Sequence, residues 1–178
     1  MQGPVTRAGP GVTFREVREE DLPLLFALRR DLALQSLLLT VPDALDDAAL
    51  HAWVARRTAE PGGMFRMAVE ATNGVAIGFV QVGQVHHRNR TGYEGLALAA
   101  DTRRRGLGQA TLGKIIDTAR EELGLLKLLS EVRTDNFVAL RAHLAVGFKI
   151  VGTLRSHFID GDGTAHDVLL LEHMLDRE

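Results

Sequence analysis

The stretch Asp101-Thr102-Arg103-Arg104-Arg105-Gly106-Leu107-Gly108-Gln109-Ala110-Thr111-Leu112 lies between two segments with different patterns. Residues 93–98 before it have the character of a β-strand, and residues 112–123 after it place apolar side chains at helical spacing. The first turn of a helix exposes backbone N–H groups without helical partners, and the helix dipole adds partial positive charge there. Two glycines and three arginines at this point predict a cradle for a diphosphate.

Two nucleotide-binding motifs match this stretch only in part. Residues 108–114 fit the first seven positions of a Walker A loop, but Ile115 stands where Ser or Thr should bind magnesium. Gly106 and Gly108 begin a dinucleotide fingerprint, which Thr111 breaks where Gly or Ala is needed. An ATP-dependent enzyme is therefore disfavoured. A basic turn that simply caps a helix is the plain alternative to a diphosphate site.

The composition is that of an ordinary globular protein. With 178 residues, of which 46% are hydrophobic, the chain can bury the core of one domain. It has no cysteine, which excludes disulfides, thiolate metal ligands and a cysteine nucleophile. A net charge of −2 gives no reason to expect nucleic acid as a partner. We expect no membrane partner and a cytoplasmic location, because no apolar run is long enough to span a bilayer and the start lacks a signal-peptide pattern.

The pattern along the chain predicts a flexible tail at residues 1–11 and a single domain at residues 12–178. Apolar alternation and compact apolar runs predict strands at residues 12–17, 64–71, 75–85, 93–98, 126–132, 148–154 and 166–174. Helices are expected after the acidic residues 19–21, after Asp46 or Asp47, after Gly106 and after Asn136. The first of these helices should end before Pro42. The adjacent residues His86 and His87 indicate a solvated loop more than a metal site.

The order of these elements, β-α-α-β-β-β-α-β-α-β-β, is accompanied by a recognisable turn. The motif Arg103-x-x-Gly106-x-Gly108 resembles the acetyl-coenzyme A pyrophosphate loop of the GCN5-related N-acetyltransferases, the GNAT superfamily. The order of elements is also that of this family. The resemblance implies an α/β (α+β) GNAT fold, in which helices flank a mixed, mostly antiparallel sheet.

A second signature lies downstream of the first. Asn136-x-x-Ala139, followed by Gly147-Phe148, looks like the family's helix and the strand after it. The resemblance runs over residues 12–174. The closing strands are weakly similar to the branch that contains ribosomal-protein N-terminal acetyltransferases and polyamine acetyltransferases.

The resemblance implies that acetyl-CoA is the acyl donor and that no metal takes part. Its pyrophosphate would lie on Arg103, Arg104, Arg105, Gly106, Leu107, Gly108 and Gln109. Main-chain groups of Leu98 and Ala99 would pair with the pantetheine arm. Asn136 would contact the cofactor, although a short polar residue before a helix is also a typical N-cap.

Two residues are the candidates for catalysis. Glu94, on the strand before the cradle, is expected to act as the base that deprotonates the amine, and its alternative is an exposed strand carboxylate. His143 stands where the family often has a tyrosine that protonates the leaving thiolate. A histidine keeps a proton donor there but makes it sensitive to ordinary pH. The alternative for His143 is a helix histidine that packs against the core.

The sequence thus predicts an acyltransferase that moves acetyl from acetyl-CoA to a primary amine of a small molecule or a peptide N-terminus, by direct attack. The alternative is a non-catalytic CoA-binding sensor or interaction module, which the missing tyrosine favours. We also expect a homodimer, since the family is often dimeric and the apolar residues 168–171 could extend a sheet.

Overall fold

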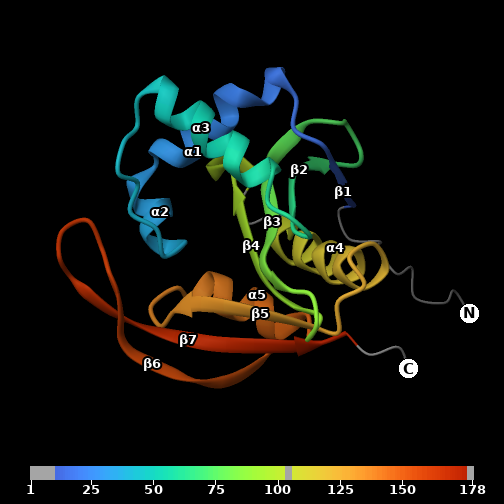
Figure 1. Cartoon of the computed structure of the whole chain (residues 1–178), viewed down its shortest axis with the longest axis vertical. Coiled ribbons are helices and arrows are strands. Elements are labelled where there is room, and N and C mark those ends of the chain that lie inside the picture. The colour runs from blue at the N-terminus through green and yellow to red at the C-terminus, as the bar shows by residue number, and fades with distance from the viewer. Residues whose placement is uncertain (1–10, 103–105, 176–178) are drawn as a thin grey trace, which may run out of the picture.

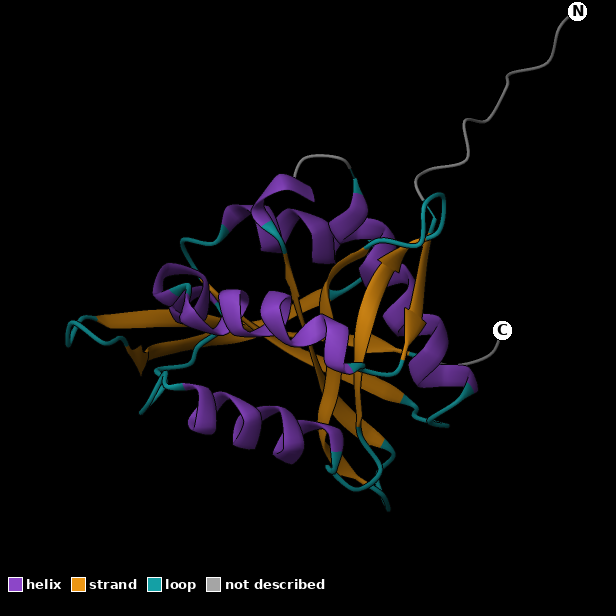
Figure 2. Ribbon diagram, turned by 90° about the horizontal axis from the view of Figure 1, so that it is seen from above, coloured by secondary structure: helices purple, strands orange, loops and turns teal. Residues whose placement is uncertain are grey.

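The structure is a computed structural model, and it describes residues 11–102 and 106–175. These residues form a seven-stranded sheet in the order β1-β2-β3-β4-β5-β7-β6, with helices on both faces (Figures 1 and 2). Every neighbouring pair of strands is antiparallel except β4 and β5. The predicted α/β class with a mostly antiparallel sheet is therefore confirmed. The predicted tail, residues 1–11, lies outside the described part apart from Gly11.

The elements follow the predicted pattern closely. The strands are β1 Val12–Arg15, β2 Met64–Glu70, β3 Ala76–His86, β4 Thr91–Leu98, β5 Lys127–Arg133, β6 Lys149–Ile159 and β7 Ala165–Met174. The helices are α1 Leu22–Arg30, α2 Leu32–Leu37, α3 Asp47–Thr58, α4 Leu107–Glu121 and α5 Phe137–Ala145. Short 3₁₀ turns precede α1, at Glu19–Asp21, and α4, at Ala100–Thr102.

The region before Pro42 differs from the prediction of one continuous helix. The chain leaves the helical conformation at Asp31, which has φ −73° and ψ 88° and separates α1 from α2. The carboxylate of Asp31 accepts a hydrogen bond from the backbone N–H of Leu34 at 3.0 Å, which caps the new helix. The order of elements therefore gains a short helix that the hydrophobic pattern did not reveal.

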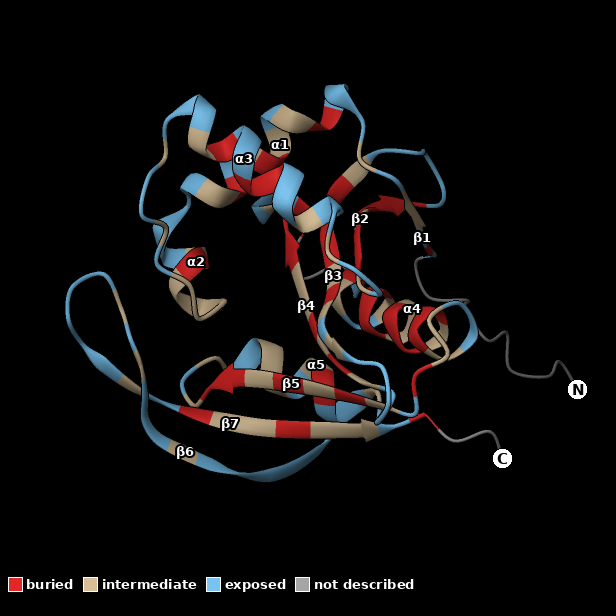
Figure 3. Cartoon of the chain, viewed as in Figure 1, coloured by how far each residue is buried: buried red, intermediate tan, exposed pale blue. Residues whose placement is uncertain are grey.

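Each face of the sheet has its own core. On one face α4 buries the apolar stripe that the sequence predicted, and the buried members of that stripe are Leu112, Ile115, Ile116 and Ala119. On the other face α1 and α3 cover β2 and β3, where Trp53 makes edge contacts with Phe65 and Phe79. In Figure 3 the buried residues of α4, in red, lie on one side of the sheet, and those of α1 and α3 lie on the other.

A close approach of two strands explains Gly78 in β3. Gly78 has φ +155°, and a Cβ atom on it would collide with the carbonyl oxygen of Ala97 on β4. The register between β2 and β3 also shifts opposite this point, between Ala68 and Val69. Gly78 therefore holds the close backbone approach that the sequence suggested.

The position of β7 corrects one expectation. Residues 168–171 were expected to extend a sheet or to shield its edge, but β7 lies between β5 and β6, and Val168 and Leu171 are fully buried. The strand at the edge is β6, which is exposed along most of its length (Figure 3). A closing strand in the sequence is thus not an edge strand in the sheet.

The feature that positions the site is the separation of β4 from β5. These parallel strands pair only from Thr91 to Tyr93 with Lys127 to Leu129. Beyond that point they diverge, and Figure 1 shows β4 and β5 running in clearly different directions. The next residues on the two strands, Glu94 and Ser130, therefore lie where the sheet opens.

Candidate active site

Three polar side chains from three elements meet where the sheet opens. Glu94 comes from β4, Ser130 from β5 and His143 from α5. They are buried, with 8%, 3% and 6% of their surfaces exposed. Buried polar groups are rarely gathered by packing alone, because each must find a hydrogen-bond partner. The opening between β4 and β5 is therefore a candidate reaction centre.

The hydrogen bonds of His143 define which nitrogen carries hydrogen. Nδ1 lies 2.7 Å from the carbonyl oxygen of Ala139, an atom that can only accept, so Nδ1 is protonated. Nε2 lies 2.8 Å from Oε1 of Glu94 and 3.0 Å from Oγ of Ser130. With a carboxylate as its nearest neighbour, Nε2 is best satisfied when it also carries hydrogen.

The charge state of His143 follows from the same neighbours. Burial alone would lower the pKa of His143. The hydrogen bond that His143 makes to Glu94, the negative charge of Glu94 and the Ala139 carbonyl outweigh burial and raise the pKa of His143 above its ordinary value of 6.5. These neighbours thus favour the charged form of His143.

The second oxygen of Glu94 has a different environment. Oε2 is buried and has no hydrogen-bond partner among the described residues. Leaving a buried acceptor unsatisfied costs about 1–3 kcal/mol, and more for a charged group. The arrangement therefore holds one carboxylate oxygen on His143 and leaves the other available to a proton donor that enters the opening.

The structure brings together residues that the sequence treated separately. Glu94 and His143 were expected to act at different steps, and exposure was the alternative for Glu94, but the two side chains are buried in direct contact. Ser130 was not predicted at all. It lies in the compact apolar run of β5, where nothing in the sequence distinguishes it from a serine that merely faces a neighbouring strand.

The N-terminus of α4 has the geometry that the sequence predicted for it. Gly106 is the N-cap residue with φ 75°, a left-handed conformation that favours glycine. Between described residues, the first helical hydrogen bond runs from Ala110 N–H to the Gly106 carbonyl, and the N–H groups of Leu107, Gly108 and Gln109 precede it in the first turn. The predicted contacts of Arg103, Arg104 and Arg105 lie outside the described residues.

Gly108 is not required by packing. A Cβ atom added to it would meet only Leu98 Cδ1, at 4.0 Å. Gly108 lies in the first turn of α4, and because it has no side chain it leaves the backbone N–H groups there open to an approaching group. The same helix rules against the Walker A alternative, since residues 108–114 are helical and leave no loop to wrap phosphates.

The other residues predicted to contact the cofactor, Leu98, Ala99 and Asn136, already form contacts within the protein. The N–H of Ala99 donates to Ile77 O at 2.8 Å, and its carbonyl accepts from Thr102. Leu98 lies opposite Gly78 in the β3–β4 ladder. Asn136 caps α5 by accepting from Ala139 N–H at 3.2 Å, the alternative role that the sequence allowed.

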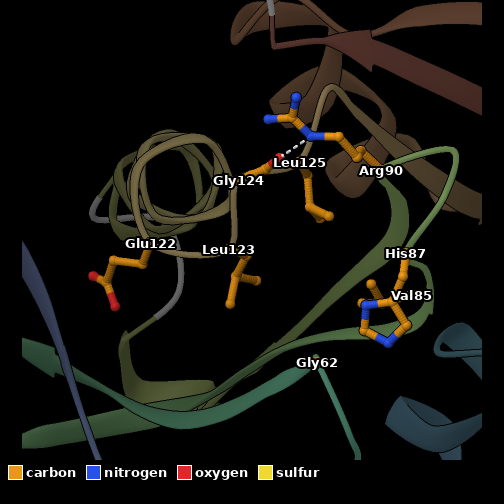
Figure 4. A pocket seen from close by; sticks show the side chains of 8 residues that line it. All are labelled: Gly62, Val85, His87, Arg90, Glu122, Leu123, Gly124 and Leu125. Carbon is orange, nitrogen blue, oxygen red and sulfur yellow. Dashed lines mark hydrogen bonds between the residues drawn. The ribbon is translucent and has the colours of Figure 1, made fainter.

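A surface hollow of about 420 Å³ lies away from this opening (Figure 4). Its walls come from the loop after α4 and from β3, and Arg90 Nε donates to the Gly124 carbonyl beside it at 2.6 Å. It lies at the C-terminal end of α4, the end opposite Gly106. This hollow is therefore separate from the candidate active site.

The described residues offer neither a cluster of metal ligands nor a membrane-spanning helix. No group of three or more His, Asp or Glu side chains within residues 11–102 and 106–175 is placed to hold a metal ion. His86 ends β3 and accepts from Asn89 N–H at 3.1 Å, in keeping with a local turn. In the same part of the chain, no helix is long and apolar enough to cross a membrane.

Comparison with protein families identifies the class. Residues 12–149 match the model of the acetyltransferase (GNAT) domain. This match covers most of the chain, and the protein therefore belongs to the acetyltransferase (GNAT) domain family. The family predicted from the two signatures is thus confirmed.

Individual relatives agree with this assignment. The chain is 30% identical over 102 residues to the uncharacterized N-acetyltransferase YoaA of Bacillus subtilis strain 168. The match covers 57% of this chain and 55% of YoaA, so the chain spans about half the length of that relative.

Solved structures establish the fold. The spermidine N-acetyltransferase of Vibrio cholerae, solved in complex with CoA and spermine, superposes with a TM-score of 0.84. It is 18% identical, over 92% of this chain and 95% of that one. A probable acetyltransferase gives a TM-score of 0.76 at 20% identity, over 92% and 93% of the two chains. The predicted GNAT fold is therefore confirmed.

Proposed function

We propose that the protein is an acetyl-CoA-dependent N-acetyltransferase that acts on the primary amine of a small molecule or of a peptide N-terminus. The observation that carries this proposal is the buried pair of Glu94 and His143 at the opening between β4 and β5. Burying two charges costs several kcal/mol for each ion, and perturbed titratable groups concentrate at functional sites. The family membership and the names of the relatives support the same chemistry.

The acyl donor would be held at the N-terminus of α4. The N–H groups of Leu107, Gly108 and Gln109 supply donors for a pyrophosphate, and Gly106 forms the turn before them. The arginines at 103–105 would add charge. Within the part of the chain that the structure describes, no strand pairs with β4 on its β5 side beyond Tyr93, which leaves room for an extended arm along this edge. Asn136, at the start of α5, completes the proposed contacts.

Bound acetyl-CoA would supply the thioester, and residues of this chain accept and donate the protons. A lysine-like amine has a pKa of about 10.4 and arrives charged. Glu94 accepts its proton through Oε2, the nitrogen attacks the thioester carbon, and the carbon–sulfur bond breaks. His143 then gives a proton to the thiolate, and the attacking nitrogen loses its second proton to water, which leaves a neutral amide and a free thiol. The two groups share a hydrogen bond, so a change in one alters the surroundings of the other.

Ser130 is proposed as a positioning residue for this pair. When His143 is neutral, its Nδ1 still donates to Ala139, so Nε2 must accept a hydrogen bond. An ionised Glu94 cannot donate one, whereas the hydroxyl of Ser130, 3.0 Å from Nε2, can. Glu94 thus stabilises the charged form of His143, and Ser130 stabilises the neutral form.

The experiment is an assay of thiol release from acetyl-CoA with primary amines, amino acids, polyamines and N-terminal peptides. Turnover with at least one class supports the proposal. The alternative is a CoA-binding sensor or interaction module, favoured by the histidine in place of the family's tyrosine. Calorimetric binding of acetyl-CoA with no turnover on any acceptor would decide for that alternative.

We also propose a homodimer, now formed through β6 and not β7. The edge strand β6 carries exposed apolar side chains at Ile150, Val151 and Ile159, and an unpaired edge is a ready site for strand addition. Sedimentation that shows only monomer at micromolar concentration would contradict this. A cytoplasmic location, the absence of a metal and the absence of nucleic-acid or membrane partners stay predictions from the sequence.

A further inference from the structure

A basic groove lies on the face of the sheet that α1 and α3 cover. It has a volume of about 610 Å³ and is lined by Arg29 from α1 and by Trp53, Arg56 and Arg57 from α3. The chain just after α3 completes the wall and contributes Glu60, the one acidic residue among those that line the groove. Three guanidinium groups therefore face one carboxylate.

Arg29 is fixed in place by uncharged partners. Its Nη1 donates to Oε1 of Gln35 at 2.6 Å and to Oγ1 of Thr40 at 3.2 Å. Its guanidinium carbon lies 5.2 Å from the centre of the Trp53 ring. Among the described residues Arg29 forms no ion pair, although its side chain is partly buried. The guanidinium of Arg29, held in this position, can direct its remaining N–H donors at a ligand in the groove.

The surrounding charges do not neutralise Arg29. Burial first, and then the charges of Arg57 and Arg56, lower the pKa of Arg29, and the charge of Asp43, the smallest of these effects, opposes them. Glu60 is already committed, since its Oε1 accepts from Gln84 N–H at 2.7 Å and its Oε2 lies 3.5 Å from Arg57. The groove therefore keeps an excess of positive charge.

An ordinary explanation covers part of this cluster. Arg56 and Arg57 are in the last turn of α3, where basic side chains are favoured by the helix dipole. The same explanation applies to Arg29, which is in the last turn of α1. It does not account for the contact of Arg29 with the buried Trp53, or for the ends of two helices meeting at one groove.

The groove is linked to the proposed reaction centre through the sheet. Glu60 reaches β3 at Gly83, where a Cβ atom would lie 2.8 Å from Glu60 Oε1. Gly83 pairs with Tyr93 on β4, and Tyr93 directly precedes Glu94. A wall residue of the groove therefore contacts the β3 residue whose partner on β4 is next to Glu94 in the chain.

We propose that this groove binds a carboxylate or phosphate group carried by the acceptor amine. This inference rests on the proposed acetyltransferase function and names the substrate class: amines that also bear an anionic group. Guanidinium groups bind planar carboxylates and phosphates through paired, charge-assisted hydrogen bonds. A polyamine would bring further positive charge to a groove that already has an excess, so polyamines should be poor acceptors.

The test uses primary amines matched in length, which end in a carboxylate, a neutral amide or a second amine. The expected order of kcat/KM is carboxylate over amide over amine. In Arg56→Gln/Arg57→Gln the ratio of carboxylate to amide should fall roughly 10- to 100-fold, the value of one or two hydrogen bonds between charged groups. The matched control is Arg18→Gln, an exposed arginine outside the groove, which should keep the wild-type ratio. Arg29→Gln is less useful because it also breaks the contacts to Gln35 and Thr40.

Several outcomes would overturn the inference. One is equal use of all three acceptors, or a preference for the amine-terminated one. Another is a carboxylate preference that Arg56→Gln/Arg57→Gln leaves intact, because the anion would then bind elsewhere. Calorimetry with inorganic phosphate and succinate tests whether the groove binds a free anion or the anionic group of the acceptor. If these anions bind the wild type but not the double variant, and do not compete with the acceptor, the groove does not bind the anionic group of the acceptor.

The failure of the proposed function has a different signature. If no amine of any class is acetylated, the acetyltransferase proposal fails and the acceptor-borne source fails with it. Binding of phosphate or succinate to the wild type and not to the double variant would still identify the groove as an anion site. If neutral amines are acetylated but charge on the acceptor has no effect, only the inference about the groove is wrong.

Discussion

Nε2 of His143 lies 2.8 Å from Oε1 of Glu94, and both side chains are buried where β4 and β5 separate. The two residues are 49 positions apart in the chain and belong to a helix and a strand. Since each charge compensates the other in a buried place, neither residue can be changed without affecting its partner. This coupling sets the direction of most of the predictions that follow.

Removing one member of the pair should cost more stability than removing both. His143→Phe leaves the carboxylate of Glu94 buried without a cation, which should lower the free energy of unfolding by about 3–5 kcal/mol. The double variant Glu94→Gln/His143→Phe removes both charges and should unfold at higher urea than His143→Phe. Additive losses in urea denaturation would show that the two side chains do not interact.

The stability of the wild type should depend on pH through His143. The pKa of His143 is raised in the folded protein above its ordinary value of 6.5, so the native state binds more protons than the unfolded state. The contribution of the pair is therefore complete below pH 6.5 and is lost as the pH rises through the folded pKa. Urea midpoints measured from pH 5 to 9 should stay level below pH 6.5 and fall above it. The double variant should lack this fall. A wild-type midpoint that rises over the same range would contradict the assignment.

The sequence could predict those parts of the fold that depend on local pattern. The apolar stripe of α4, the caps at Asp46 and Asn136 and the close approach at Gly78 are local or nearly local features, and the structure has them. The contact of Ser130 with His143 is not local, because it depends on where β4 and β5 stop pairing. The same holds for the groove, where α1 and α3 must pack before their arginines meet.

The acid role of His143 predicts a specific kinetic loss. In His143→Phe, assayed where the variant is folded, turnover should fall by about 10²–10⁴ while affinity for acetyl-CoA stays near that of the wild type. His143→Tyr should recover much of the rate, because it restores the group that the family often has. Full activity of His143→Phe would make the histidine a packing residue, with water as the proton donor to the thiolate.

Glu94→Gln should fail in a different way. The glutamine keeps the size of the side chain but cannot accept the amine proton, so the rate should fall most at neutral pH. As the pH rises the amine deprotonates without help, and the variant should approach the wild type. The profile of kcat/KM against pH is the measurement. A deficit that stays constant up to pH 10 would assign Glu94 to structure alone.

Ser130→Ala tests the positioning role. Without the hydroxyl, neutral His143 has no donor for Nε2, so the charged form is favoured and the pKa of His143 should rise further. The alkaline limb of the rate profile, where the acid His143 loses its proton, should move with it, and NMR titration of the imidazole reports the same shift directly. Ser130→Thr keeps the hydroxyl and should restore the wild-type titration. An unchanged titration in Ser130→Ala would mean that the serine only fills space.

The last prediction separates the anion site at α4 from the stability of α4 itself. Gly108 and Gly113 are both within this helix, and neither is required by packing, since a Cβ atom at Gly113 meets nothing within 4 Å. Gly108→Asp and Gly113→Asp therefore place the same side chain on the same helix. Position 108 is in the first turn, and position 113 is more than one turn further along. An aspartate in the first turn interacts favourably with the helix dipole, so Gly108→Asp should be at least as stable as Gly113→Asp. It should nevertheless lose binding of acetyl-CoA, because its bulk and negative charge occupy the place of the pyrophosphate. Calorimetry should show near wild-type affinity for Gly113→Asp, and equal affinities in the two folded variants would place the diphosphate elsewhere.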